Sequence, residues 1–372
     1  MNQKDIEGRD TAWREDLRKA MTAKERADIP RAQMPMLDGD YRVTCNEEVN
    51  QGLSLEQARL EATRCLDCPN PTCVEGCPVG IHIPDFIKNI QRGDLPEAAA
   101  ILKLTSALPA VCGRVCPQEK QCESRCIYNK MKKAPVAIGY LERFAADAEI
   151  ARGSEEGDDK PASNGIRVAV AGSGPAGLSF AGEMARRGFE VDVFEALHEI
   201  GGVLKYGIPE FRLPNSIVDA ELANLRRAGV RFHSDTVIGK TLSYDDLLCQ
   251  GFKGVFVASG AGLPRFMGIP GENYCGVLSS NEYLTRINLM GAGRPGCDTP
   301  APIGKRVAVV GGGNTAMDSV RTARRMGAEK AMIIYRRSEA EMPARREEIE
   351  HAKQEGVEFM TCLLYTSPSP RD

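Results

Sequence analysis

The feature that most constrains the fold is a glycine-rich turn between two short hydrophobic runs. The run Ile-Arg-Val-Ala-Val-Ala at residues 166–171 leads into the turn Gly-Ser-Gly-Pro-Ala-Gly at residues 172–177. A helical stretch then extends to about Arg187, and a second hydrophobic run ends at Glu195. This order of strand, G-x-G-x-x-G turn, helix, strand and acid is the fingerprint of a dinucleotide-binding βαβ unit. The sequence therefore predicts a parallel α/β fold here.

Each glycine of this turn has a physical role in binding a dinucleotide. Gly172 permits the tight turn, Gly174 lets a pyrophosphate approach the backbone, and Gly177 lets the helix pack on the strand. Pro175 and Ala176 open the helix, whose N-terminus faces the phosphates. The alternative is a glycine-rich turn that binds no ligand, but the complete context favours a dinucleotide site.

A second turn of the same kind follows further along the chain. The run Arg-Val-Ala-Val-Val at residues 306–310 leads into Gly-Gly-Gly-Asn-Thr-Ala, and a helix is expected up to about Met326. Alanine fills the third glycine position, which the fingerprint tolerates. The residues expected to contact a nucleotide in this turn are Gly311, Gly313, Asn314, Thr315 and Ala316.

The two units differ at the end of their second strand. The first ends in Glu195, whose carboxylate can bind ribose hydroxyls, whereas the second ends in Arg336 and Arg337. A carboxylate repels a 2′-phosphate and a guanidinium can clamp it. The first unit therefore suits FAD or NAD and the second suits NADP. The alternative for the two arginines is an exposed basic strand end.

Two dinucleotide units in one chain indicate a flavoprotein that uses a nicotinamide. The segment between the units contains glycines that would let the backbone lie against a flat ring system. These are Gly201, Gly202 and Gly207. Gly260 follows the run Phe-Val-Ala-Ser at residues 256–259, which predicts a strand and a second turn facing a flavin. Hydride transfer between such cofactors needs no general acid or base, so no catalytic side chain is expected.

Eight of the thirteen cysteines lie in the segment 65–126. They are Cys65, Cys68, Cys73, Cys77, Cys112, Cys116, Cys122 and Cys126. The charged first ten residues contain no signal peptide, which indicates the cytoplasm, where disulfides are rare. Structural zinc sites commonly use two C-x2-C pairs or histidines, whereas these spacings are irregular and the chain has only four histidines. The Cys-Pro pairs at Cys77 and Cys116 are typical of ferredoxin-type runs, so iron–sulfur is favoured over zinc.

The remaining composition narrows the function and the domain organisation. The net charge of −3 argues against binding nucleic acid or a membrane surface, and no apolar run is long enough to span a bilayer. Residues 1–150 read as helices, with a capping box at Ser54 and another helix opening at Pro84. The isolated cysteines are expected to be small buried residues. They are Cys45, Cys249, Cys275 and Cys297.

The predicted fold class is α/β: a helical iron–sulfur domain followed by two Rossmann-like dinucleotide-binding domains, the second incomplete. The expected boundaries are a helical domain at 1–150, a solvated linker at 151–165, an FAD domain at 166–300, an NADPH domain at 301–361 and a tail at 362–372. The tail fits no element of the fold and resembles a translated sequencing adapter. The native sequence is therefore expected to end near Thr361, within the second dinucleotide domain, and Cys362 is given no role.

The ordered motifs resemble a known family. They are the run Cys65 to Cys77-Pro, the run Cys112-Gly-Arg-Val-Cys116-Pro, the two glycine turns and the segment Glu341-Met-Pro-Ala-Arg345. Over about residues 40–361 the chain resembles the small (β) subunit of NADPH-dependent glutamate synthase. The same module looks like the N-terminal part of dihydropyrimidine dehydrogenase and the large subunit of NADH-dependent ferredoxin:NADP oxidoreductases. The resemblance implies two 4Fe–4S clusters, FAD and NADPH.

The resemblance also implies that the two cysteine runs are interleaved. One cluster would take Cys65, Cys68, Cys73 and Cys126, and the other would take Cys77, Cys116, Cys122 and the carboxylate of Glu142. The sequence pattern alone leaves Glu142 at the edge of an inward helical stripe, where a surface glutamate is the alternative. Cys112 is the rival fourth ligand, and a simple division into one cluster for each run is the other arrangement.

Three functions compete at this stage. The first is an NADPH-oxidising subunit that passes electrons through FAD and two clusters to the glutamate synthase large subunit or to another electron acceptor. The second is the large subunit of an electron-bifurcating ferredoxin:NADP oxidoreductase, or an electron-transfer module that is inactive without its partner. The third is a thiol–disulfide reductase using Cys65 and Cys68 as a dithiol, which the six other cysteines nearby make the weakest of the three.

Overall fold

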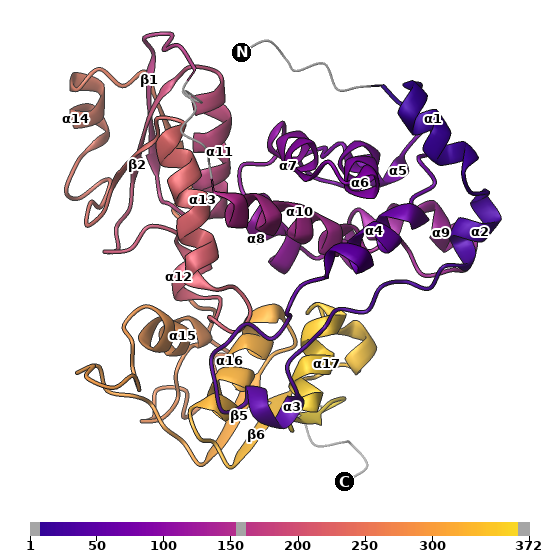
Figure 1. The fold of residues 1–372 in the computed structure, drawn as a ribbon. Coiled ribbons are helices and arrows are strands. Elements are labelled where there is room, and N and C mark those ends of the chain that lie inside the picture. The colour runs from indigo at the N-terminus through magenta and orange to yellow at the C-terminus, as the bar shows by residue number, and fades with distance from the viewer. Residues whose placement is uncertain (1–7, 154–160, 364–372) are drawn as a thin grey trace. The chain divides into compact units, whose positions relative to one another are not determined.

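A computed structural model describes residues 8–153 and 161–363 of the chain (Figure 1). Residues 154–160 of the expected linker and most of the expected tail lie outside the described residues. The chain forms two compact units. Of the described residues, unit 1 contains 8–36, 50–153, 161–200 and 216–258, and unit 2 contains 37–49, 201–215 and 259–363.

The N-terminal part of unit 1 is helical, as the sequence predicts. Its helices are α1 (Ala12–Lys19), α2 (Ala23–Asp28), α4 (Leu55–Arg64), α5 (Thr72–Glu75), α6 (Ile83–Arg92), α7 (Leu95–Lys103), α8 (Pro109–Val115), α9 (Ile127–Lys130) and α10 (Ile138–Arg152), with 3-10 turns at Gln118–Lys120 and Glu123–Arg125. Figure 1 shows α4, α6, α7, α8 and α10 grouped together.

The predicted helix ends are confirmed in this part. The Ser54 hydroxyl accepts a hydrogen bond from the Gln57 amide at 3.2 Å, and the Ser54 amide donates to the Gln57 side chain at 2.9 Å, which completes the capping box that starts α4. Pro84 stands in the first turn of α6, and Gly93 ends this helix in the left-handed region at a φ of 92°.

The helical core forms where the apolar faces of α4, α6, α7 and α10 meet. Phe86, Ile90 and Leu141 are fully buried there. Helices α8 and α10 approach closely at Gly113, where an added Cβ would lie 2.5 Å from the amide nitrogen of Arg143. This contact brings the second cysteine run against α10.

The first sheet of unit 1 is parallel and has the strand order β3-β2-β1-β4. Its strands are β1 (Arg167–Ala171), β2 (Glu190–Phe194), β3 (Arg231–His233) and β4 (Gly254–Val257). The connecting helices are α11 (Pro175–Arg186), α13 (Asn215–Arg227) and α14 (Tyr244–Cys249). In register, Val168 pairs with Val191 and with Gly254, so the strand before the first glycine turn lies inside the sheet. The predicted βαβ unit is confirmed.

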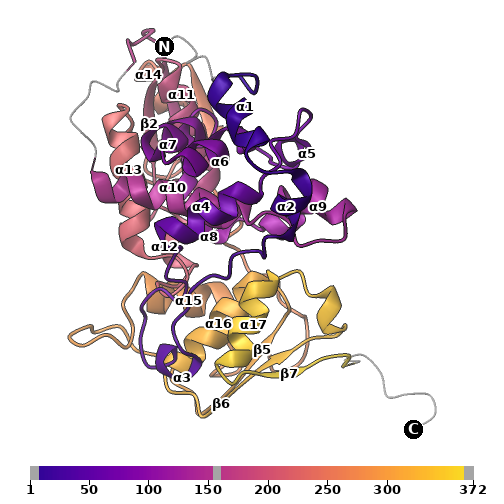
Figure 2. The ribbon, with the colours of Figure 1, turned by 45° about the vertical axis from the view of Figure 1, so that its right-hand side comes forward.

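Unit 2 contains a second parallel sheet, of order β5-β6-β7. Its strands are β5 (Arg306–Val310), β6 (Lys330–Ile334) and β7 (Glu358–Met360), and its helices are α3 (Gly39–Arg42), α12 (Val203–Tyr206), α15 (Ser280–Asn288), α16 (Asn314–Arg325) and α17 (Arg346–Gln354), with a 3-10 turn at Glu339–Glu341. Helix α16 packs on β5, β6 and α17, as Figure 2 shows. The second predicted βαβ unit is confirmed as well.

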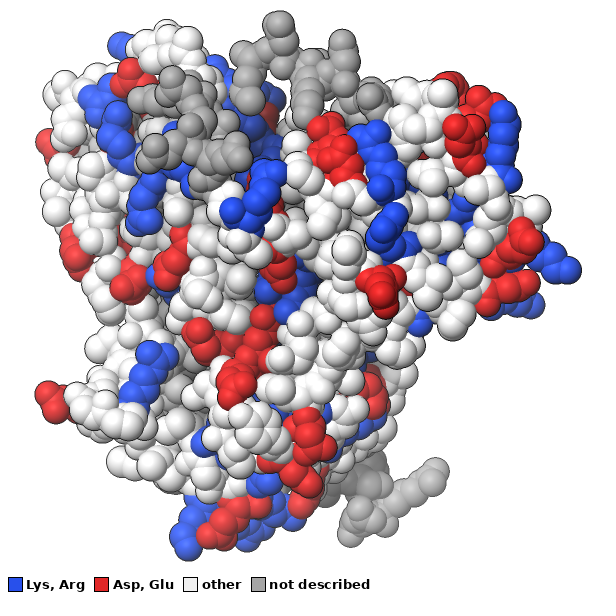
Figure 3. Space-filling model, viewed as in Figure 1, with Lys and Arg blue, Asp and Glu red and all other residues white. Residues whose placement is uncertain are grey.

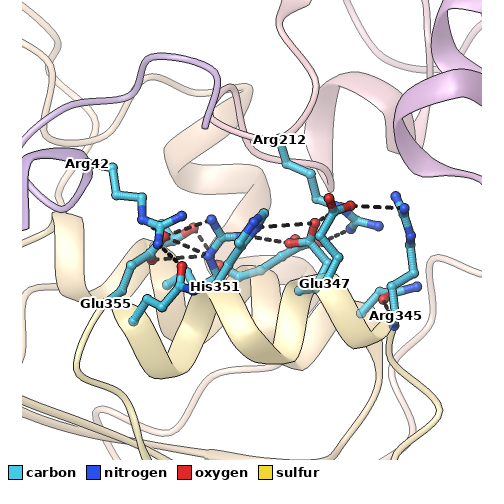
Figure 4. Close-up of polar contacts among 12 residues, drawn as sticks. Arg42, Arg212, Arg345, Glu347, His351 and Glu355 are labelled. Atoms are coloured by element: carbon cyan, nitrogen blue, oxygen red, sulfur yellow. Dashed lines mark hydrogen bonds and ion pairs between the residues drawn. The ribbon is translucent and has the colours of Figure 1, made fainter. Parts of the chain in front are cut away.

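A buried ionic network connects three separate segments of unit 2 (Figure 4). Arg42, from the segment that carries α3, lies 3.5 Å from the carboxylate of Glu355 on α17. Arg212 lies 2.8 Å from Asp318 on α16, and Arg321 of the same helix lies 2.8 Å from Glu355. Because each buried charge has a partner, the network holds residues 37–49 and 201–215 on the α16–α17 pair.

The isolated cysteines correct one expectation. They were predicted to be buried, yet Cys249 and Cys275 are exposed, and Cys45 and Cys297 are half-buried. Cys249 ends helix α14 and Cys275 lies in a loop, where few side chains cover them.

On the face that Figure 3 presents, Lys and Arg side chains are mixed with Asp and Glu side chains. Within the described ranges, no helix is long and apolar enough to cross a membrane.

Candidate functional site

The first cysteine site is a cavity lined by four thiols. Cys65 follows α4, Cys68 lies in the next loop, Cys73 lies within α5, and Cys126 precedes α9. The other lining side chains are mostly apolar, among them Ile83, Ile87, Tyr128, Val136 and Ile138. The structure therefore brings Cys126 of the second run to three cysteines of the first run. The remaining cysteine of the first run, Cys77, is not among the residues that line this cavity.

Burial makes these thiols weak acids in the absence of a metal. Burial and the neighbouring cysteines raise the pKa of the Cys68 thiol to about 11 and also raise the pKa of Cys65 and Cys73. A metal reverses this effect, because it binds the thiolate and displaces the proton. Within the described ranges, no three His, Cys, Asp or Glu side chains converge on one metal ion. A 4Fe–4S cluster fits the donor set because its thiolates surround a cavity rather than meet at one point.

A clamp from the N-terminal helix holds the loop between Cys65 and Cys68. Asp67 is fully buried and has a left-handed φ of 53°. Its carboxylate accepts hydrogen bonds from Arg14 and, at 2.7 Å, from Arg18, both on α1. The buried charges compensate one another, so α1 is fastened to the cysteine loop.

The second cysteine site forms where α8 and the following loop meet α10. Cys122 lies within electrostatic range of Cys77, Cys116 and Glu142. Cys112, in the middle of α8, likewise lies within electrostatic range of Glu142 and Cys116. The structure thus gathers the three cysteines and the glutamate of the expected second set, and it keeps the rival Cys112 beside them. Their roles as ligands stay a prediction.

Glu142 is buried without a full set of hydrogen bonds. Its side chain is 5% exposed, and its Oε1 atom has no hydrogen-bond partner. Burial and the nearby Glu221 raise the pKa of Glu142 to about 8. Ile138, Leu141 and Ala145 are buried on the same stripe of α10, so the surface-glutamate alternative is wrong. A buried carboxylate lacking a hydrogen bond beside three thiols is a suitable donor set for a metal centre.

The first glycine turn has the geometry that its sequence predicts. Gly172 has a φ of 106°, which favours glycine, and an added Cβ on Gly177 would lie 2.1 Å from the Gly172 carbonyl oxygen. Gly174 is the N-cap of α11, and Pro175 and Ala176 stand exposed in its first turn.

The acid at the end of β2 is tied to this turn. Glu195 is buried, and its carboxylate accepts hydrogen bonds from the Ser173 amide at 2.9 Å and from the Leu197 amide at 3.0 Å. Each carboxylate oxygen can accept more than one hydrogen bond, so Glu195 keeps capacity for ribose hydroxyls.

The second glycine turn is braced by the segment after β6. The Ala344 amide donates to the Gly312 carbonyl at 3.1 Å, and the Arg345 amide donates to the Asn314 side chain at 2.9 Å. Gly311 has a φ of 142°, Gly313 is the N-cap of α16, and Thr315 and Ala316 lie in its first turn. The Glu341 to Arg345 motif therefore supports the loop that would hold a nucleotide.

The two arginines after β6 are exposed. Arg336 and Arg337 follow Tyr335, which is the first residue after β6. They lie at the sheet edge where the glycine turn also lies. Among the described residues neither guanidinium makes an ion pair. Two exposed cations without carboxylate partners are available for an anionic ligand, although an exposed basic strand end would look the same.

The remaining predicted flavin-facing glycines belong to unit 2. Gly201 and Gly202 have φ values of 137° and 56° and precede α12. An added Cβ on Gly207 would lie 2.6 Å from a methyl group of Val203. Gly260 has a φ of 73° after β4, and its surroundings are open. Their contact with a flavin stays a prediction.

Two family models match the chain. Residues 42–154 match the dihydropyrimidine dehydrogenase domain II with its 4Fe–4S cluster. Residues 166–365, more than half of the chain, match the pyridine nucleotide-disulphide oxidoreductases. The chain belongs to the pyridine nucleotide-disulphide oxidoreductase family. Both glycine turns lie within the second match, and all eight clustered cysteines lie within the first.

Curated relatives are subunits of differently named oxidoreductases. The glutamate synthase (NADPH) small chain of Azospirillum brasilense is 37% identical over 84% of this chain and 66% of the relative. The NADP(+)-dependent formate dehydrogenase subunit beta of Moorella thermoacetica is 39% identical over 77% and 42%. The NADPH-Fe(3+) oxidoreductase subunit beta of Geobacter sulfurreducens is 38% identical over 82% and 44%. This member of the family therefore spans two thirds or less of the length of each relative.

Three functional candidates escaped the sequence reasoning: Asp67, Lys88 and Glu221. Asp67 lies inside the Cys65–Cys68 loop, and the spacing of the two cysteines does not predict that the Asp67 side chain is buried. Glu221 of α13 is buried and accepts a hydrogen bond from the Ala110 amide at the start of α8 at 2.7 Å. A long-range contact of this kind leaves no signal in either segment alone. Lys88 is discussed below.

Proposed function

We propose that this protein oxidises NADPH and passes the electrons through FAD and two 4Fe–4S clusters to a partner subunit. The observation that carries the proposal is the combination of two dinucleotide turns with two groups of neighbouring cysteines in one chain. Three relatives support it, because their names pair NADPH or NADP+ with a synthase, a dehydrogenase or an oxidoreductase.

The first dinucleotide turn fits FAD. Gly172, Gly174 and Gly177 leave room for a pyrophosphate at the N-terminus of α11, and Glu195 can accept hydrogen bonds from ribose hydroxyls. FAD, when bound, accepts two electrons with a hydride and can release them one at a time. The chain contributes binding and orientation, and no side chain is required to move a proton.

The cysteine groups fit two iron–sulfur clusters. Cys65, Cys68, Cys73 and Cys126 would hold the first, inside the apolar cavity. Cys77, Cys116, Cys122 and Glu142 would hold the second, and the Glu142 oxygen without a hydrogen bond supports a carboxylate ligand. Clusters accept single electrons, which suits them to carry charge away from a flavin.

The proposed partner is an electron-accepting subunit, and glutamate synthesis is the favoured purpose. That chemistry also needs an ammonia-producing site and a second flavin site, which we assign to the glutamate synthase large subunit. The relative named for Fe(3+) reduction favours a second candidate, in which the same electron relay serves another acceptor. The relative named as an NADP(+)-dependent formate dehydrogenase subunit favours a partner of another kind as well. Identification of the protein that co-purifies with the full-length gene product separates these candidates.

Nucleotide preference tests the proposal directly. With a tetrazolium dye as acceptor, the double substitution Arg336→Ala and Arg337→Ala should lower the NADPH/NADH ratio of kcat/KM by about tenfold to a hundredfold, since a charge-assisted phosphate contact contributes a few kcal/mol. The full-length gene product is used.

Arg306→Ala is the matched control for this experiment. Arg306 is also exposed, but it begins β5 at the end of the strand opposite the glycine turn. Its loss should leave the ratio unchanged. If the double variant keeps the wild-type ratio, the assignment of NADPH to Arg336 and Arg337 is wrong.

A further inference from the structure

Lys88 is a buried cation without a carboxylate partner. It lies on α6 and its side chain has no exposed surface. Its ammonium nitrogen donates to the Cys65 carbonyl oxygen at 2.6 Å and to the Gln91 side chain at 2.8 Å. No carboxylate oxygen of the described residues lies within 4.0 Å of it. Burying an ammonium group without a counter-charge is costly, so an anionic group is expected nearby.

Three of the other cations around this site pair with carboxylates. Arg14 and Arg18 pair with Asp67, and Arg64 pairs with Glu61 at 2.6 Å. Arg26 donates to backbone carbonyls, including that of Thr63 at the end of α4. Burial lowers the pKa of Lys88, and negative charges at Cys65 and, to a smaller extent, at Asp67 oppose that shift. Among the described residues, Lys88 and Arg26 are thus the buried cations here without a carboxylate within 4.0 Å, and Lys88 is the one that donates to the backbone of a cysteine of the first site.

The second cysteine site is bordered by acidic side chains instead. Glu142 is buried there, and Glu221 lies close enough to raise its pKa. Glu123, near Cys122, is compensated by Arg31 at 2.8 Å. An ammonium group without a carboxylate within 4.0 Å therefore lies at the first site, and buried acidic side chains lie at the second.

We propose that Lys88 is the buried counter-charge of the first cluster and raises the reduction potential of that cluster above the potential of the second. The inference rests on the proposed function, because it requires a cluster at Cys65, Cys68, Cys73 and Cys126. Reduction adds one negative charge to a cluster. A nearby cation stabilises the reduced form, and a nearby anion destabilises it.

The direction of electron flow follows from this ordering. One electron leaves the second cluster and enters the first, and no bond or proton is exchanged. Because the first cluster has the higher potential, the electron rests there at equilibrium. The contact between Glu221 of α13 and the Ala110 amide of α8 connects the second site to the flavin-binding part of unit 1. The first cluster is then the exit towards the partner.

Three substitutions at Lys88 separate its charge from its hydrogen bonds. Lys88→Gln keeps a donor for the Cys65 carbonyl but removes the charge, Lys88→Met removes both, and Lys88→Arg keeps both. Redox titration of the full-length holoprotein, followed by EPR, measures the potential of each cluster. Lys130→Gln is the control, because Lys130 is an exposed lysine four residues after Cys126, where water screens its charge.

The expected result is selective for one cluster. Lys88→Gln and Lys88→Met should lower the equilibrium constant for reduction of the first cluster at least tenfold, which is 59 mV for one electron, and leave the second unchanged. Lys88→Arg and Lys130→Gln should match the wild type. Loss of the first cluster in Lys88→Met with retention in Lys88→Arg also supports the proposal, because the charge is then needed for assembly.

Two results overturn the inference. One is an unchanged first potential in Lys88→Gln, and the other is loss of the first cluster in Lys88→Arg as well. Failure of the proposed function looks different, because the wild-type protein would then contain no iron or acid-labile sulfide.

Discussion

The two cysteine sites lie in different electrostatic surroundings. The first is an apolar cavity with the buried ammonium of Lys88 beside the Cys65 backbone. The second includes the buried carboxylate of Glu142, one of whose oxygens has no hydrogen bond. Since charge near a redox centre sets its potential, clusters bound at these two sites would differ in potential because of the buried side chains around them.

The sites also differ in what holds them in place. A salt bridge from Arg14 and Arg18 to Asp67 fastens the loop of the first site to α1. The second site depends on close helix packing at Gly113, where α8 lies against the backbone of α10. One site is therefore sensitive to loss of charge, and the other is sensitive to added volume.

The largest expected effect comes from the carboxylate of the second site. Glu142→Ala should remove one EPR signal or shift its potential and leave the other signal intact, because iron would lose a ligand that the structure holds in a buried position. Cys112→Ala should leave both signals in place. EPR spectra of the reduced variants check both statements.

Glu149→Ala is the control for this pair, since Glu149 lies on the same helix but pairs with Lys103 at 2.7 Å near the surface. If Cys112→Ala loses a cluster while Glu142→Ala keeps both spectra and potentials, the carboxylate ligand must be abandoned in favour of Cys112.

Next in size is the clamp of the first site. Asp67→Asn should lower the free energy of unfolding by about 3–5 kcal/mol, because it leaves buried arginines without their counter-charge. Asparagine tolerates the left-handed φ at this position, so the backbone need not move. Denaturant unfolding measures the loss, and EPR should show a change in the first cluster only.

Asp10→Asn is the matched control for the clamp. Asp10 lies 3.9 Å from Arg18, but its side chain is 93% exposed, so its ion pair contributes little. If the two variants lose equal amounts of free energy of unfolding, burial of the Asp67 clamp does not contribute to stability.

The smallest expected effect is steric. Gly113→Ala should lower the free energy of unfolding by about 1–3 kcal/mol, because the new methyl group meets backbone atoms of α10. It should also disturb the second cluster selectively. Gly254→Ala is the control, since an added Cβ there meets nothing within 4 Å. A perturbed first cluster with an intact second one would refute this account of the packing.

Much of the fold could be predicted from local patterns. The glycine turns at Gly172 and Gly311 lie between strands and helices as predicted, because their geometry is determined by a few adjacent residues. The capping box at Ser54 is equally local. The position of Glu142 was only half predictable, since its periodicity placed it at the edge of a stripe and tertiary contacts decided its burial.

Lys88 shows why the rest could not be predicted. The apolar residues of α6, Ile83, Phe86, Ile87 and Ile90, form one stripe, and Lys88 lies outside it. Helical periodicity therefore assigns Lys88 to solvent. It is buried because its ammonium group reaches the Cys65 carbonyl, 23 residues earlier in the chain. The exposure of Cys249 and Cys275 has the same origin, because neighbours from distant segments decide whether a small side chain is covered.

The interleaving of the two cysteine runs is the central structural claim, and one pair of variants tests it most directly. Cys73→Ser and Cys77→Ser differ by four positions in the same run. EPR of the reduced holoproteins should show that Cys73→Ser loses the signal of the first cluster and Cys77→Ser loses that of the second, because Cys73 lines the first cavity and Cys77 lies near Cys122. Loss of the same signal in both variants would contradict the account and restore one cluster for each run.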